Sequence, residues 1–217
     1  MTNLERTETN LPARDGEADA IGRAASENAS FDKLLKFKKG DYYCDGEEIP
    51  MGTQYVAHVV GWTKCWIKFI DGAMVERKLY SVGKRQYPPD SSELDNNDES
   101  KWGIGPNGLP SDPWVFQYLL PLEHVESGDI VVFTTPSVGG KRAVDDLCNA
   151  YYRRYKREGT SHMPIVALRE AKMPSKKWGD VPRPYFEIIG WEGVKEGIRE
   201  TQLSEKAQHD MNDSIPF

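Results

Sequence analysis

The chain has 217 residues, a length that suits one sizeable domain or a domain with tails. Hydrophobic residues make up 38% and the mean hydropathy is −0.64, so part of the length is too polar to enter a core. No apolar run approaches the roughly 18 residues of a membrane-spanning helix, and the N-terminus lacks the residue order of a signal peptide. We therefore expect a cytoplasmic protein with no membrane partner.

The net charge is divided unevenly along the chain. Residues 1–30 and 192–217 each hold six acidic and three basic residues, which accounts for the whole formal net charge of −6. Both flanks lack a convincing apolar face, so we expect disordered acidic tails around a neutral domain at 31–191. The acidic total therefore does not argue against an anionic partner for the domain itself.

The domain is predicted to consist mainly of strands. β-branched and aromatic runs bounded by Gly, Pro or Asp are typical of strands. Such runs lie at 53–62, 64–80, 114–123, 129–135, 163–171 and 185–191, after a short basic segment at 31–43 that leads into a strand. Asp71-Gly72 predicts a hairpin within the second run, and residues 126–129 predict a turn.

Residues 141–158 break the strand pattern and predict one amphipathic helix. Its apolar positions recur at helical spacing; they are Val144, Leu147, Cys148, Tyr151 and Tyr155. Ser137 is placed near the N-cap and Gly159 can end the helix. The glycine pair before the helix marks a turn, and such a turn can also bind one phosphate.

This order of elements favours a partly closed antiparallel barrel with one helix. A parallel sheet would need helices between most of its strands, whereas the OB-fold accommodates several strands, a helix after about the fourth, and closing strands. We therefore predict a mainly β, OB-like barrel. A β-sandwich with an extra helix is the alternative.

A long loop is expected at 84–113, which holds five of the fourteen prolines. Loops of this size in a compact domain tend to be functional or mobile. Five acids of this loop could hold Mg²⁺ for phosphodiester cleavage; they are Asp90, Glu93, Asp95, Asp98 and Glu99. Metal ligands need rigid elements, and the three cysteines form no zinc pattern, so we expect a non-catalytic protein without metal or cofactor.

The run "WTKCWIKFI" at 62–70 is the clearest candidate for a binding surface. Read with period two, Trp62, Lys64, Trp66 and Lys68 share one face of a strand, and the other face is apolar. Alternating indoles and ammonium groups match the flat bases and phosphates of single-stranded nucleic acid. The alternative is that both indoles cover the barrel or pack under the long loop, with lysine stems over them.

Other basic residues support an anionic partner. The region 153–183 has nine Lys or Arg against three acids, and its part at 172–180 is predicted to be a hairpin loop, the element with which OB-folds often embrace nucleic acid. The further candidate contacts are Arg77, Lys84, Arg85, Arg153, Arg154, Lys156, Arg157, Lys172, Lys176, Lys177 and Trp178.

The chain ends in an apolar tripeptide behind acids, "NDSIPF". Presenting Phe217 and its carboxylate to a partner costs less entropy than ordering the polar tail on the domain. This ending resembles the acidic C-terminal tip of bacterial single-stranded-DNA-binding proteins, which closes with Asp-Ile-Pro-Phe and recruits replication, recombination and repair enzymes. The resemblance assigns partner contacts to Asp210, Asp213, Ile215, Pro216 and Phe217.

The resemblance covers only the tip, where Ser214 replaces an acid of the family, and the whole build is similar to that of a phage or mobile-element protein. It implies a protein that coats single-stranded DNA in a bacterial or phage-infected cell and recruits host or phage enzymes through its tip. A homo-oligomer is possible. The alternatives are an adaptor or decoy that mimics the host tip, and a Mg²⁺-dependent nuclease.

Overall fold

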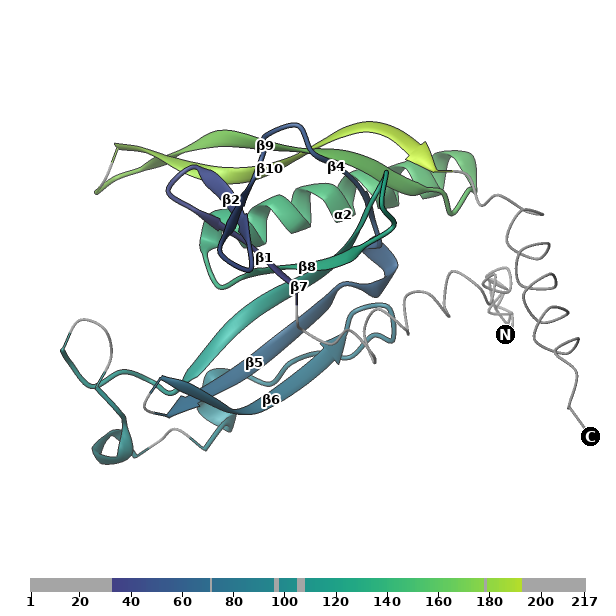
Figure 1. Cartoon of the computed structure of the whole chain (residues 1–217). Coiled ribbons are helices and arrows are strands. Elements are labelled where there is room, and N and C mark those ends of the chain that lie inside the picture. Colours follow the sequence, from purple (N-terminus) through teal and green to yellow (C-terminus); the bar gives the residue numbers. More distant parts are fainter. Residues whose placement is uncertain (1–32, 71, 96–97, 105–107, 178, 193–217) are drawn as a thin grey trace, which may run out of the picture.

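The computed structural model describes residues 33–192 except 71, 96–97, 105–107 and 178 (Figure 1). The acidic flanks expected at 1–30 and 192–217 lie outside the described residues, except for Glu192, which is the last residue of β10. The strands are β1 (Leu34–Lys38), β2 (Asp41–Cys44), β3 (Glu47–Ile49), β4 (Gln54–Ala57), β5 (Thr63–Ile70), β6 (Ala73–Ser81), β7 (Trp114–His124), β8 (Ile130–Thr135), β9 (Met163–Ser175) and β10 (Gly179–Glu192). One α-helix, α2 (Val138–Glu158), and three short 3₁₀ helices, η1 (Val59–Gly61), η2 (Ser91–Glu93) and η3 (Glu99–Lys101), complete the described elements.

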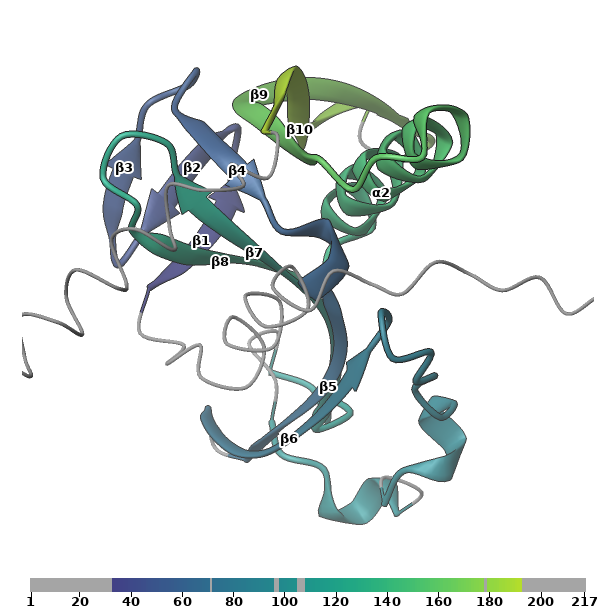
Figure 2. The same cartoon turned by 90° about the vertical axis from the view of Figure 1, so that its right-hand side faces the viewer.

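All ten strands belong to one sheet that branches at β7. The main path runs β10-β9-β4-β7-β8-β1-β2-β3, and β5 joins β7 from the side and carries β6. The first half of β7 pairs with β5, and its last residues pair with β4. The β5–β6 hairpin therefore extends from the sheet as an arm, below the curled part that holds the other strands (Figure 2).

A buried tyrosine joins two distant parts of the curled sheet. The Tyr42 hydroxyl on β2 donates to the Arg169 carbonyl on β9 (3.0 Å) and accepts from the Tyr185 N–H on β10 (3.2 Å). Burial raises the pKa of the Tyr42 phenol above its ordinary value, so the group remains a donor. The sheet forms a half-barrel, and the predicted mainly β, OB-like barrel with one helix is confirmed.

Helix α2 packs its apolar face into this half-barrel. Ala143, Val144 and Leu147 are buried in a core that also contains Leu120 and Phe133. The Ser137 Oγ caps the helix by accepting from the Gly140 N–H (3.0 Å), and Gly159 ends it with a φ of 67°. The prediction placed the start three residues late, because the glycines gave no apolar signal.

The glycine pair at the start of α2 allows close packing. A Cβ on Gly140 would overlap the Thr135 side chain, and a Cβ on Gly139 would lie 2.9 Å from the Arg183 Cβ. Both positions are buried against protein atoms. The pair therefore has a packing role, and the phosphate-binding interpretation gains no support from it.

The other predicted elements are largely observed. The hairpin joining β5 and β6 turns where Asp71-Gly72 predicts it, and Gly72 has a φ of 78°, while Asp71 lies outside the described residues. The run 53–62 is divided into β4 and η1. Strands β9 and β10 are longer than expected, so Lys172 lies on a strand and the turn begins only after Ser175. Eight strands, rather than about four, precede the helix. Among the described residues, no helix is long and apolar enough to span a membrane.

Replacing Tyr42 by Phe should destabilise the fold without removing its ring from the core. The Tyr185 N–H and the Arg169 carbonyl would each lose a partner in a buried region, which costs about 1–3 kcal/mol. Urea unfolding of the two proteins measures this loss. Tyr43→Phe is the matched control, because consecutive strand residues face opposite sides. Equal losses in both variants would contradict the role of the Tyr42 hydroxyl.

Candidate nucleic-acid interface

Three neighbouring strands present one continuous surface of aromatic and lysine side chains. Their registers place three residues side by side in each of three rows: Tyr80, Lys64 and Tyr118; Lys78, Trp66 and Phe116; Glu76, Lys68 and Trp114, from β6, β5 and β7 in turn. Directly paired residues share a face of a sheet. We call these nine residues the aromatic–lysine face.

Ammonium groups and rings contact one another throughout this face. The Lys64 Nζ lies 5.4 Å from the Trp62 ring and 5.5 Å from the Tyr118 ring. The Lys68 and Lys78 Nζ atoms lie 5.6 and 4.8 Å from the Trp114 ring. Such cation–π contacts hold the ammonium groups over aromatic surfaces. The face therefore carries positive charge on a rigid apolar floor.

Part of the loop between β6 and β7 lies against the face. The Trp66 Nε1–H donates to the Pro89 carbonyl (3.1 Å). The Asp95 carboxylate accepts from the Lys68 Nζ and from the Trp114 Nε1–H, both at 2.7 Å. These hydrogen bonds, first from Lys68 and then from Trp114, lower the pKa of Asp95. Leu94, which is 4% exposed, anchors the same segment.

The two tryptophans of β5 and its flank differ in their placement. Trp62 is 9% exposed and belongs to the core, in contact with Tyr118. Trp66 is only partly buried and lies 4.9 Å from the Phe116 ring. These contacts agree with the alternative interpretation, in which the indoles cover the barrel or pack under the loop. Trp66 and Phe116, both partly exposed, are the rings best placed to meet a base.

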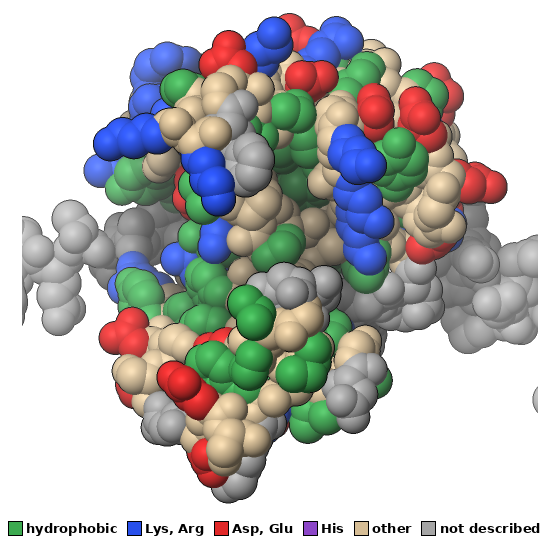
Figure 3. Space-filling model, turned by 90° about the vertical axis from the view of Figure 1, so that its left-hand side faces the viewer, with side chains coloured by type: hydrophobic (Ala, Val, Ile, Leu, Met, Phe, Trp, Pro, Cys, Tyr) green, Lys and Arg blue, Asp and Glu red, His purple; other side chains and the backbone are tan. Residues whose placement is uncertain are grey.

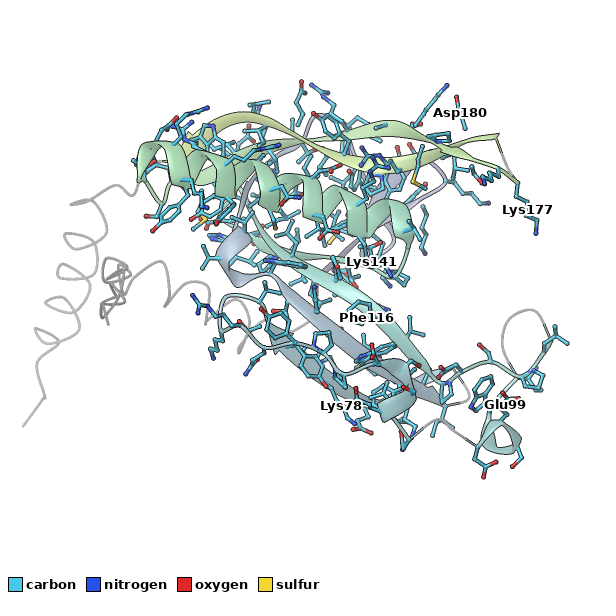
Figure 4. All side chains as sticks on the ribbon, turned by 180° about the vertical axis from the view of Figure 1, so that it is seen from behind. Lys78, Glu99, Phe116, Lys141, Lys177 and Asp180 are labelled. Carbon is cyan, nitrogen blue, oxygen red and sulfur yellow. The ribbon has the colours of Figure 1, made fainter. Side chains whose placement is uncertain are left out.

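The start of α2 and the β9–β10 hairpin lie across from the loop. The Lys141 Nζ, in the first turn of α2, is 5.4 Å from the Phe116 ring. Figure 4 shows Lys141 and Phe116 between the hairpin tip, which carries Lys177, and the side that carries Lys78 and Glu99. In the space-filling view, a hollow separates the upper part of the molecule, with α2 and the β9–β10 hairpin, from the lower part, with the β5–β6 arm and the long loop. Lys and Arg side chains gather on the upper part (Figure 3). Lys176 and Lys177 are exposed at the tip.

The basic region at 153–183 is divided between the two ends of the helix. The β9–β10 hairpin passes the start of α2, where Met173 and Arg183 approach Gly139, and its tip projects beyond the helix (Figure 4). Arg153, Arg154, Lys156 and Arg157 lie in its last turns. A helix of 21 residues is about 30 Å long, so these two groups cannot contact the same nucleotide.

The basic residues at the end of α2 have contacts of their own. Arg154 pairs with Glu158 (2.7 Å) and lies 4.4 Å from the Trp191 ring. Arg157 also contacts Glu158 (2.8 Å), and the Lys156 Nζ lies 4.9 Å from the Tyr152 ring. This cluster is separate from the aromatic–lysine face.

The remaining predicted contacts are dispersed. Arg77 pairs with Ile67 on the opposite face of the β5–β6 arm. Lys84 and Arg85 are exposed in the turn after β6, and Lys172 is exposed on β9. Trp178 and the five residues of the C-terminal tip lie outside the described residues.

Of the nine residues of the face, only Lys64, Trp66 and Lys68 were predicted contacts. Trp114, Phe116 and Tyr118 alternate along β7 in the same way as the β5 residues do, and a period-two reading of "WVFQY" would have found them. Lys141 had no sequence signal beyond its charge, because it reaches Phe116 only through the packing of α2.

Several acids of the long loop form hydrogen bonds that hold the loop in its conformation or against the sheet. The Glu93 carboxylate accepts from the Asp90 N–H (3.1 Å), and the Asp98 carboxylate accepts from the Ser100 N–H (3.2 Å). Asp95 bonds Lys68 and Trp114 as described above. Within the described part of the chain, no three His, Cys, Asp or Glu residues are grouped so that they could hold a metal ion.

Comparison with protein-family models, with curated proteins and with solved structures found no match to this chain. Any functional conclusion therefore depends on the chemistry of its own residues.

The contact between Asp95, Lys68 and Trp114 should be sensitive to acid. Because the pKa of Asp95 is lowered in the folded protein, the contact stabilises the fold above the ordinary Asp pKa and is lost as pH falls through the folded value. A titration of tryptophan fluorescence from about pH 6 to about pH 2 should show a step. Asp95→Asn should lack this step, and identical titration curves for the two proteins would contradict the assignment.

Proposed function

We propose that the protein is a non-catalytic single-stranded-DNA-binding protein. The observation that carries this proposal is the aromatic–lysine face, where lysines of β5 and β6 lie among the rings of three neighbouring strands. In a nucleic-acid strand, flat bases can stack on the rings while charged phosphates bind the ammonium groups. Each base stacked on an aromatic side chain contributes roughly 1–3 kcal/mol. Single strands expose base faces that a duplex hides.

The surroundings of the face support a strand-shaped ligand. Lys141 lies on one side of Phe116 and Lys64 contacts the adjacent Tyr118, so cations flank the central rings. The lysines of the β9–β10 tip can follow a phosphate backbone as it leaves the face, because the exposed tip projects beyond the start of α2. A hairpin and a long loop on either side of a sheet suit an OB-like site.

Recruitment of partner enzymes is the second part of the proposal. It rests on the Ile215-Pro216-Phe217 ending behind Asp210 and Asp213. A terminal aromatic with its carboxylate can fill a pocket beside an arginine, while the acids favour a basic rim. Replication, recombination and repair enzymes of the host or phage are the proposed partners.

Titration of the full chain with dT oligomers tests DNA binding. Stacking should quench tryptophan fluorescence, and the affinity should fall steeply as salt rises, since each phosphate contact releases counterions. Unchanged fluorescence together with no gel shift at low salt would overturn the proposal.

Removing Pro216 and Phe217 should abolish partner binding while DNA binding persists.

Two matched double variants test which basic group contacts the DNA. Lys176→Gln with Lys177→Gln removes two charges at the hairpin tip, and Arg153→Gln with Lys156→Gln removes two exposed charges at the far end of α2. The first should lower the slope of log affinity against log salt by about 2, roughly 1 per lost phosphate contact. The second should leave the slope unchanged. The reverse result would place the DNA along the end of α2.

A further inference from the structure

Two hydrogen-bond donors of the aromatic–lysine face converge on one point at its outer row. The Lys68 Nζ and the Trp114 Nε1–H each bond a different oxygen of the same carboxylate, Asp95 Oδ2 and Oδ1, both at 2.7 Å. Lys68 and Trp114 are on adjacent strands in a direct pair. The sheet register therefore keeps these two side chains next to each other, whether or not Asp95 is present.

The donors are largely buried, whereas their acceptor is exposed. The Trp114 side chain is 4% exposed, and the Lys68 side chain is 17% exposed. The Asp95 side chain is 63% exposed and faces solvent. Its segment is held independently by the buried Leu94 and by the Pro89 contact with Trp66. Asp95 can therefore turn away from the donors while the loop stays in place.

The chemistry of the pair suits a phosphate oxygen as well as a carboxylate. A phosphodiester has two non-bridging oxygens that accept hydrogen bonds and share one negative charge, as the two oxygens of a carboxylate do. Charged acceptors form the strongest hydrogen bonds with such donors. The Lys78 Nζ lies 4.8 Å from the Trp114 ring and 3.5 Å from the Glu76 carboxylate, so its charge is balanced by that acid and the subsite depends on Lys68 and Trp114.

We infer that Lys68 and Trp114 form a phosphate subsite, which the carboxylate of Asp95 occupies in the absence of nucleic acid. A backbone phosphate of the bound strand exchanges with this carboxylate, so that one anion replaces another. This inference rests on the proposed function, because it assigns one contact within that site. While it is bound to the two donors, the Asp95 carboxylate lowers the affinity of the face for anions that bind these donors less tightly than it does.

Removing the charge of Asp95 should tighten DNA binding. We expect Asp95→Asn to lower the dissociation constant for a dT oligomer by roughly two- to fivefold, the range that partly exposed ion pairs are worth. Glu99→Gln is the matched control, since it removes one negative charge from the same loop at a residue that lies away from Phe116 and Lys78 (Figure 4). An equal gain in both variants would show a general charge effect and overturn the subsite.

A double-mutant cycle gives a second readout. Lys68→Gln should weaken binding, and Asp95→Asn should bring no gain in the Lys68→Gln background, because the competing carboxylate has lost its main partner. Additive effects would overturn the inference. If neither the native protein nor Asp95→Asn binds DNA, the proposed function fails; if both bind equally, only the subsite fails.

A spectroscopic measurement locates the exchange at the two donors. The indole N–H resonance of Trp114, identified by its loss in Trp114→Phe, should shift when dT oligomer is added to ¹⁵N-labelled protein. Asp95→Asn alone should shift the same resonance. An indole resonance of Trp114 that stays unchanged at saturating DNA would exclude phosphate binding at this subsite.

Discussion

Strand β7 is the constraint on which the rest of the structure depends. Its first half, from Trp114, pairs with β5, its last residues pair with β4, and β8 lies along its other edge. The same strand thus contributes Leu120 and Leu122 to the core and Phe116 to the exposed arm. A strand shared in this way joins the curled sheet and the arm rigidly, since a slip of one residue would turn every side chain to the wrong face.

The chemistry of the aromatic–lysine face follows from this pairing. Ammonium groups lie over rings, and Asp95 pairs with Lys68 in the outer row. The rings and the Asp95 carboxylate already hold these ammonium groups in place. A ligand that replaces the carboxylate therefore has few further side chains to order. Preorganisation of this kind lowers the entropic cost of binding. Closure of the half-barrel by Tyr42 holds the β9–β10 hairpin beside the start of α2 in the same rigid frame.

Part of the site could be predicted from the sequence because strand periodicity is local. The alternation of Trp66 and Lys68 on one side of β5 is visible in the residues themselves. The grouping of basic residues was less successful. Arg153 and Lys177 are close enough along the chain to suggest one surface, but a 21-residue helix and a long hairpin place them at opposite ends. Charge density along a chain says little about charge density in space.

The sequence by itself determined the mainly β class, helix α2 with its Ser137 cap and Gly159 end, and the hairpin at Gly72, because each depends on local conformational preferences. Only the tertiary structure decided that Trp62 is buried while Trp66 is partly exposed, since burial depends on which strands pair with β5 and on where the loop lies. It likewise decided that Lys68 and Trp114, 46 positions apart in the numbering, present their donors to one oxygen pair. The pairing of β5 with β7 is a long-range contact, and no local pattern encodes its register.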